Sequence, residues 1–316
     1  MKRERDPDDE EENVELVKST TTDKSSGPEY VDDILRYLRQ KEEENRPTMA
    51  KFLQRQKIVT ANMRTILMDW MSSVACEYHL ANETLFLSFA VLNRMFDMFE
   101  IDSKNRIQLL GTTCLWIASK LEEIFPPVMS DYVYITDNAY CNDEMISMES
   151  TILQMMNYNL YIPSPYTFLC HFVHALGLKR ENRSFQERFC LASFILEIAM
   201  LRLESLDYLP SHMAAAALLL ALTTPDNPSN TDTSTENVID KLFVINANDN
   251  SRTQTDHLIN YLVDQVNCSS SELMSLRDTL KMWRHSFLDV CRVTKLGNDV
   301  YEKYSSRRYC NVATWP

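Results

Sequence analysis

Apolar residues recur at helical spacing along most of the chain. The densest stretch, Asn105 to Pro127 (NRIQLLGTTCLWIASKLEEIFPP), carries apolar side chains almost all round a helical wheel. This pattern predicts a central helix that is buried on nearly every side and stopped by Pro126-Pro127. Small residues such as Gly111 would let neighbouring helices approach its backbone closely. Its closing charges, among them Lys120 and Glu123, are most simply interpreted as solvated helix-end charges.

Similar periodicity predicts further helices, in two groups separated by Pro163 and Pro165. The second group repeats the first in character, with a small-residue apolar helix near its middle. We therefore expect a two-lobed, all-α protein. The predicted helices lie at 30–38, 63–80, 84–99, 105–127 and 143–156 in the first group, and at 166–176, 184–203, 212–222, 258–266 and 271–290 in the second.

The helix that begins at Met63 has two apolar faces. One face follows the series i, i+3, i+4, i+7, i+11, and Met68, Met71 and Ala75 form the other. Such a helix is either fully buried, or buried on one side and exposed as a docking surface on the other. The first face consists of Met63, Ile66, Leu67, Trp70 and Val74.

Two segments are too polar to form a core. Residues 1–28 are acidic and then rich in Ser, Thr and Lys, which predicts a disordered tail. Residues 223–256 are rich in Thr, Asn, Asp, Ser and Pro around a small apolar island, which predicts a mobile insertion.

Composition excludes several classes of function. The chain has 316 residues but only four glycines, and neither a GxGxxG nor a GxxxxGK[ST] phosphate-binding loop can be written with them. The formal charge of −13 opposes direct binding to nucleic acid. No apolar run reaches the ~20 residues of a membrane helix, and no secretory leader precedes the body, so we expect an intracellular, soluble protein without a membrane partner.

No catalytic or metal site can be assembled from the residues. The eight cysteines are scattered without a CxxC pair, and we interpret them as reduced core residues. Cys170, His171 and His174 form the best candidate cluster, but the second ligand pair of a zinc motif is missing. We expect no enzymatic activity, no metal and no cofactor.

Four stretches together resemble the A/B-type cell-cycle cyclins, with a leaning toward the A type. These are YVDDILRYLR (30–39), MRTILMDW (63–70), LLGTTCLWIASKLEEIFPP (109–127) and VYITDNAY (133–140). The resemblance implies an all-α fold of two tandem five-helix cyclin boxes preceded by an N-terminal helix. The implied boundaries are a tail at 1–28, the helix and first box at 29–162, and the second box at 163–316.

The resemblance also implies a function. A cyclin binds a cyclin-dependent protein kinase, repositions its regulatory helix and activation segment, and so assembles the kinase's active site without doing chemistry itself. It implies control of cell-cycle progression (S phase and G2–M), in the nucleus and cytoplasm. By position, the kinase-binding residues would be the charged pair Lys120 and Glu149, with Leu121, Tyr158, Leu160, Tyr30 and Ile34.

Related cyclins also dock RxL-type peptides of substrates and inhibitors on the exposed face of the Met63 helix. The groove-lining positions would be Met63, Ile66, Leu67, Trp70, Ile107, Gln108, Ile135 and Asp137. Ser73 stands where relatives carry a Glu that faces the arginine of the peptide. Because Asp137 would then be the remaining rim carboxylate, we expect weaker docking with a shallow salt dependence.

Two further departures from the family pattern matter. Asn93 replaces the Asp that normally pairs with the arginine of the MRxIL motif, Arg64, so a buried guanidinium would face a neutral amide unless another carboxylate substitutes. The segment before the boxes contains no RxxL degradation signal, which puts that destruction route in doubt.

Two alternative functions remain at this point. A cyclin-fold transcription factor would need basic faces for DNA, which the acidic balance disfavours. A transcription-associated cyclin would still be a kinase subunit, but the MRTIL stripe disfavours it.

Overall fold

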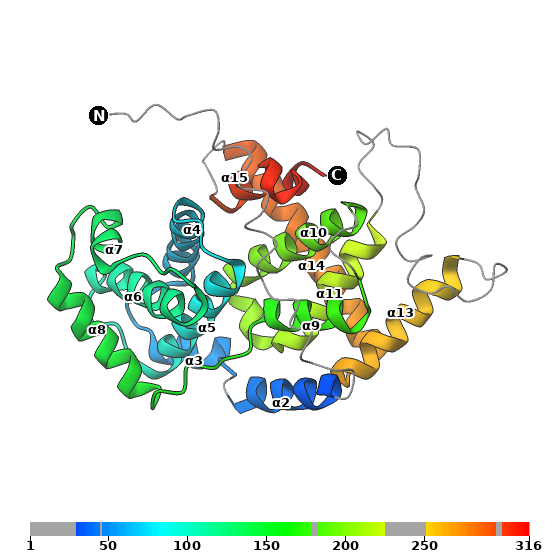
Figure 1. The fold of residues 1–316 in the computed structure, drawn as a ribbon, viewed down its shortest axis with the longest axis horizontal. Coiled ribbons are helices and arrows are strands. Elements are labelled where there is room, and N and C mark those ends of the chain that lie inside the picture. Colours follow the sequence, from blue (N-terminus) through cyan, green and yellow to red (C-terminus); the bar gives the residue numbers. More distant parts are fainter. Residues whose placement is uncertain (1–29, 45, 179–182, 225–250, 295–298, 316) are drawn as a thin grey trace. The chain divides into compact units, whose positions relative to one another are not determined.

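The computed structural model describes residues 30–44, 46–178, 183–224, 251–294 and 299–315, and these residues form helices joined by loops (Figure 1). The chain divides into a unit of residues 1–37 and a compact unit of residues 38–316. The helices are α2 (Val31–Glu44), α3 (Met49–Arg55), α4 (Ala61–Glu77), α5 (Asn82–Met98), α6 (Asn105–Glu122), α7 (Met129–Ile135), α8 (Asn142–Met155), α9 (Pro165–Ala175), α10 (Arg183–Leu201), α11 (Pro210–Thr223), α13 (Ser251–Val266), α14 (Ser270–Thr294) and α15 (Asp299–Tyr304).

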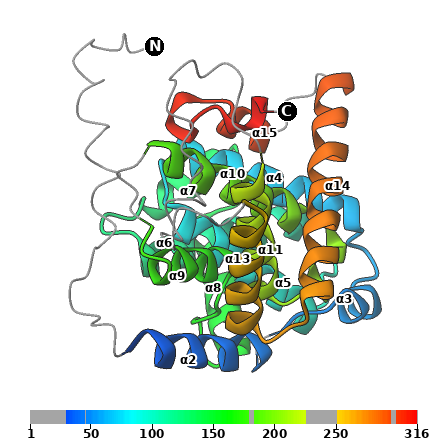
Figure 2. The same cartoon turned by 90° about the vertical axis from the view of Figure 1, so that its right-hand side faces the viewer.

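The larger unit contains two groups of helices, each built around one apolar helix. In the first group, α4, α5 and α8 pack against α6, and in the second, α9, α10, α13 and α14 pack against α11. Figure 1 shows the groups as α4–α8 and α9–α14, and Figure 2 shows α13 and α14 running alongside α11. The predicted all-α fold of two tandem boxes is confirmed.

Gly111 brings α4 and α6 close together. A Cβ atom added at Gly111 would lie 2.8 Å from Leu67 Cδ1, which is closer than real contacts allow. The Leu67 side chain therefore occupies the space that any other residue at 111 would fill. This contact holds the MRTIL helix against the central helix of its group.

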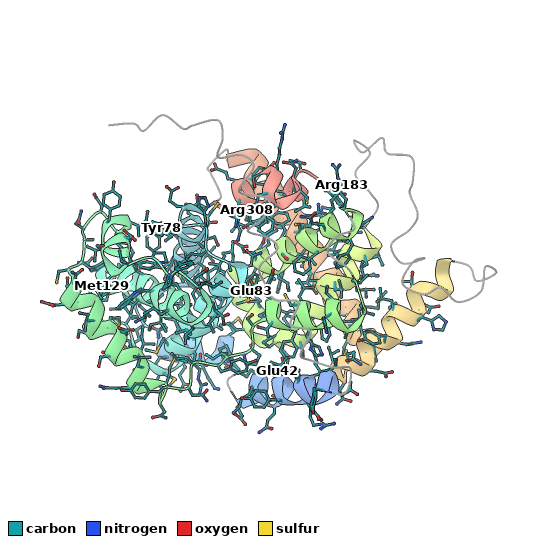
Figure 3. All side chains as sticks on the ribbon, in the orientation of Figure 1. Glu42, Tyr78, Glu83, Met129, Arg183 and Arg308 are labelled. Atoms are coloured by element: carbon teal, nitrogen blue, oxygen red, sulfur yellow. The ribbon has the colours of Figure 1, made fainter. Side chains whose placement is uncertain are left out.

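Residues Met213 to Leu222 of α11 are all buried. At each end of this helix, a side chain from elsewhere in the chain forms hydrogen bonds with its terminal groups. At the N-terminus, the Glu42 carboxylate accepts hydrogen bonds from Ser211 N (2.9 Å) and Ser211 Oγ (2.7 Å) (Figure 3). At the C-terminus, Arg188 Nη1 donates to Ala221 O (2.9 Å) and to Thr224 O. An anion at the N-terminus and a cation at the C-terminus both complement the helix dipole.

A C-terminal segment, residues 299–315, connects the two groups of helices. Lys303 Nζ donates to Glu197 Oε2 of α10 (2.8 Å) and to Asn82 Oδ1 of α5 (3.1 Å). Both Lys303 and Glu197 are buried, and Tyr304 Oη donates to the same Glu197 oxygen (2.9 Å). The hydrogen bonds that Lys303 donates to Asn82 and that Glu197 accepts from Tyr304 offset part of the cost of desolvating this ion pair.

Several sequence predictions need correction. The central helix ends at Glu122 and not near Pro127, because Glu123 turns away to bind another helix end. Helices α3, α7 and α15 were not predicted, since each is short. The insertion predicted at 223–256 is wrong at both ends, where Thr223 closes α11 and α13 begins at Ser251. Residues 225–250 and the predicted tail at 1–28 lie outside the described residues.

The cysteine prediction is correct in part. None of the eight, all of which lie in the described ranges, forms a disulfide, as expected. Cys114 and Cys190 are buried, but Cys141 is exposed and the others are half-buried, so the interpretation as core residues is wrong for most of them. The cysteines that are not fully buried can be reached by reagents from solvent.

Glu42 should make stability depend on pH. Burial raises the pKa of its carboxyl from 4.5 to about 7, so the folded state binds more protons than the unfolded state between those values. The free energy of unfolding should therefore fall as pH rises from 4.5 to 7, by at most about 3 kcal/mol from this group. Glu42→Gln keeps partners for both Ser211 groups and should flatten that slope in urea titrations. The exposed Glu43→Gln is the control, and an unchanged slope in Glu42→Gln would contradict the assignment.

Candidate functional site

Lys120 and Glu149 form an ion pair on the surface between α6 and α8. Lys120 lies in the last turn of α6, where a cation complements the helix dipole, and its Nζ donates to Glu149 Oε1. The same ammonium lies 3.6 Å from the centroid of the Trp116 ring, so it also makes a cation–π contact. The pair predicted from the sequence is therefore preorganised, and both side chains remain partly accessible to a partner.

Exposed apolar side chains follow both partners of this ion pair along the chain. Tyr158 is 70% exposed and sits in a left-handed turn (φ 58°) after α8, while Leu160 is half-buried. Leu121 in the last turn of α6 is exposed, as are Ile124 and Phe125 just after the helix, and Phe125 reaches 91%. Large apolar side chains that are this accessible mark an interaction surface more often than a folding requirement. The sequence prediction named Leu121 and Tyr158 but missed Ile124 and Phe125.

Glu123 fixes the start of this exposed segment. Its Oε1 accepts hydrogen bonds from Ala81 N (2.8 Å) and Thr84 Oγ1 (2.5 Å), at the N-terminus of α5. The carboxylate thus caps a neighbouring helix, and the simple interpretation as a solvated helix-end charge is wrong for this residue. The cap sets the direction in which the chain leaves α6 toward Ile124 and Phe125.

Arg64 lies fully buried between the two groups of helices. Its Nε donates to Asn93 Oδ1 (2.9 Å), the hydrogen bond expected from the sequence. Nη2 donates to Met200 O (3.0 Å) and Nη1 to Leu201 O (3.3 Å), two carbonyls that α10 leaves open at its C-terminus. Burial lowers the pKa of Arg64 to about 9, and the charge of Glu204 opposes that shift. The negative end of the α10 dipole thus replaces part of the missing carboxylate.

The face of α4 that was expected to form a docking groove is partly accessible. Ile66 is 60% exposed, while Met63 and Trp70 are half-buried. Leu67 and Ile107 are buried, so they can form only the floor of such a surface. Of the other expected residues, Gln108 and Ile135 are half-buried and Asp137 is exposed.

A carboxylate absent from the sequence prediction lies beside Ser73. Asp299, the first residue of α15, forms a side-chain hydrogen bond with Ser73, and desolvation raises the pKa of Asp299. One turn away, Asp69 Oδ1 accepts from Val300 N (3.3 Å), and burial raises the pKa of Asp69 to about 6. The C-terminal segment therefore supplies an acid where α4 lacks one. No local sequence signal could have found it, since the two residues are more than 200 positions apart.

Other expectations concern the unit of residues 1–37, metal binding and membrane spans. Tyr30 and Ile34 belong to the separate unit of residues 1–37, four positions apart at the start of α2. Within the described ranges, no cluster of three His, Cys, Asp or Glu side chains could hold a metal ion, and Cys170, His171 and His174 do not make one. Among the same residues, no helix combines the length and apolarity needed to cross a bilayer.

Comparison with protein families identifies the class. Residues 33–161 match the cyclin N-terminal domain, and residues 163–316 match the cyclin C-terminal domain. Together with the two helical boxes, these matches show that the chain belongs to the cyclin family. The resemblance seen in the sequence is thereby confirmed.

Individual relatives are A-type and B-type cyclins. The chain is 40% identical over 212 residues to putative cyclin-A3-1 of Arabidopsis thaliana. The aligned region covers 66% of this chain and 59% of that protein. It is 36% identical over 210 residues to cyclin-A1 of Homo sapiens (66% and 43%) and 38% identical over 211 residues to G2/mitotic-specific cyclin-B of Spisula solidissima (66% and 46%). The match thus spans about half the length of these relatives.

A solved structure shares the fold. The X-ray structure of a viral cyclin from herpesvirus saimiri superposes with a TM-score of 0.55 at 22% identity, over 76% of this chain and 99% of that one. At this level of identity the likeness concerns the fold alone.

The environment of Arg64 predicts the effect of restoring the family's carboxylate. Asn93→Asp should raise the free energy of unfolding at pH 7 by about 1 kcal/mol, because a charged acceptor binds a buried guanidinium more strongly than an amide does. Asn93→Ala should lower it by about 1 to 3 kcal/mol, since one donor of Arg64 loses its partner. Urea denaturation measures both. An Asn93→Asp protein less stable than the wild type would show that the α10 carbonyls already suffice.

Proposed function

We propose that this protein binds and activates a cyclin-dependent Ser/Thr protein kinase, and that it controls cell-cycle progression in the nucleus and cytoplasm. The observation that carries the proposal is the Lys120–Glu149 ion pair flanked by exposed apolar side chains. An ion pair held at the mouth of a buried helix offers fixed donors and acceptors, and the apolar side chains offer area to bury. The protein does no chemistry in this mechanism and acts by holding the kinase in its active arrangement.

The arrangement explains how a small surface can select one state of a partner. A ligand shifts a conformational equilibrium only by its difference in affinity for the two states. Lys120 is held by Glu149 and Trp116, so it loses little side-chain freedom on binding and needs little reorganisation. A rigid surface of this kind should bind more weakly to a kinase whose regulatory helix is in its inactive position.

Lys120→Ala and Glu149→Ala should each weaken kinase binding by about 30-fold or more, because each removes half of a preorganised pair at the centre of the surface. The free energy of unfolding should change by less than about 1 kcal/mol, as is usual when an accessible ion pair is removed. Calorimetric titration against a purified cyclin-dependent kinase measures the affinity. The matched control is Lys57→Ala, which removes another exposed ion pair, with Glu100 (3.4 Å). Wild-type affinity in both variants would refute this interface.

We also propose that the exposed face of α4 docks RxL-type peptides of substrates and inhibitors. Ile66 and Trp70 supply accessible apolar area, and Asp137 and Asp299 supply carboxylates for the arginine. The second carboxylate changes the expectation drawn from Ser73 alone: docking should have an appreciable salt dependence, because two acids face the cation.

Fluorescence anisotropy with a labelled RxL peptide tests this docking. Trp70→Ala should abolish binding, and Asp299→Ala should weaken it several-fold at low salt and flatten its salt dependence. Glu302→Ala, on the same short helix but exposed, is the control for general charge effects. Binding by Trp70→Ala as tight as wild type would show that the α4 face is not the docking surface.

A further inference from the structure

Two cysteines from distant parts of the chain lie side by side. Cys190 is buried on α10, and Cys310 is half-buried near the end of the C-terminal segment. Their thiols are joined by a side-chain hydrogen bond, and neither cysteine forms a disulfide. Neither the kinase-binding surface nor the α4 face uses them.

The contacts on either side hold this pair in register. Going back along α10, Glu197 binds Lys303, Phe194 packs on Tyr304 (ring centroids 5.0 Å apart), and Arg188 lies 5.5 Å from the Trp315 ring. As residue numbers fall along α10, the numbers of their partners in the C-terminal segment rise, so the two segments run in opposite directions. The thiol pair lies between the Phe194–Tyr304 contact and the Arg188–Trp315 contact. Packed side chains on both sides therefore hold α10 and the C-terminal segment in this register.

The local chemistry favours reaction at Cys310. The hydrogen bond from Cys190 lowers the pKa of the Cys310 thiol, which increases the thiolate fraction at neutral pH. Cys310 is accessible to a small oxidant and Cys190 is buried next to it. An accessible thiolate with a neighbouring thiol is the usual arrangement of a reversible oxidation site.

We propose that Cys190 and Cys310 form a peroxide-sensitive thiol pair whose oxidation to a disulfide fixes the C-terminal segment to α10. The Cys310 thiolate attacks one oxygen of hydrogen peroxide, the O–O bond breaks, and the departing hydroxide takes up a proton to leave as water. The Cys190 sulfur then gives up its proton and attacks the sulfenic sulfur, the S–O bond breaks, and a second water leaves. The two thiols lose two electrons, which the peroxide gains.

The disulfide would act on both groups of helices. Cys310 belongs to the C-terminal segment, which begins at Asp299 and Val300. These two residues bind Ser73 and Asp69 of α4. Near Cys310, Arg308 Nη1 also lies 3.5 Å from His79 Nδ1, after α4 (Figure 3). A covalent bond to α10 would therefore restrain the element that carries the Asp299 carboxylate.

Peptide mapping by mass spectrometry tests the site. The full 316-residue chain is treated with hydrogen peroxide, free thiols are blocked with N-ethylmaleimide, and the protein is digested without reductant. We expect a cross-linked peptide that contains Cys190 and Cys310 and disappears with dithiothreitol. The exposed Cys141 reports that oxidant reached the protein. Oxidation of Cys141 without the cross-linked peptide would overturn the proposal.

Variants separate the pair from a general effect of oxidation. Cys310→Ser should abolish the cross-link, Cys190→Ser should leave a sulfenic acid on Cys310 that dimedone traps, and Cys141→Ser should behave like the wild type. Circular dichroism establishes that each variant folds. Oxidation should raise the Tm of wild type by roughly 5 °C and leave that of Cys310→Ser unchanged. A cross-link without any rise in Tm would contradict the fixing of the segment.

Discussion

The arrangement of the two boxes depends on one buried cation. Arg64 leaves α4 in the first box, passes Asn93 of α5 and ends at the last carbonyls of α10 in the second box. These donors and acceptors are removed from water, so any displacement of the boxes would leave a buried charge unsatisfied, which costs several kcal/mol. Thr65 Oγ1 donates to the same Leu201 carbonyl (2.8 Å) and supports this connection. Satisfying this guanidinium is therefore a main constraint on how the two boxes are arranged, and Lys303 between Glu197 and Asn82 adds another.

A second constraint places the proposed kinase-binding surface. Gly111 lets α4 pack closely on α6, and Glu123 ties the end of α6 to the start of α5. These two contacts hold the C-terminal half of α6 in place, and Lys120 in its last turn meets Glu149 there. The core of the first box therefore places the ion pair and the exposed Phe125 at the surface of the box.

Elements with strong periodicity could be predicted from the sequence, and long-range partners could not. The apolar runs of α6 and α11 predicted both central helices, and the positional resemblance to the family predicted the Lys120–Glu149 pair. Short helices such as α15 carry too few residues to show a period. The acceptors of Arg64 on α10, the caps of α11 and the Asp299–Ser73 pair join residues far apart in the chain, and nothing in the local pattern marks such a contact. The role of Glu123 was missed for the same reason.

We propose that this chain, by binding, converts an inactive kinase subunit into an active one. The most direct test mixes the purified protein with a purified, monomeric cyclin-dependent kinase and measures phosphate transfer from labelled ATP to a histone substrate. The account predicts little transfer by either protein alone and a large, saturable increase when the two are combined. Formation of a stable complex with no increase in phosphate transfer would contradict it.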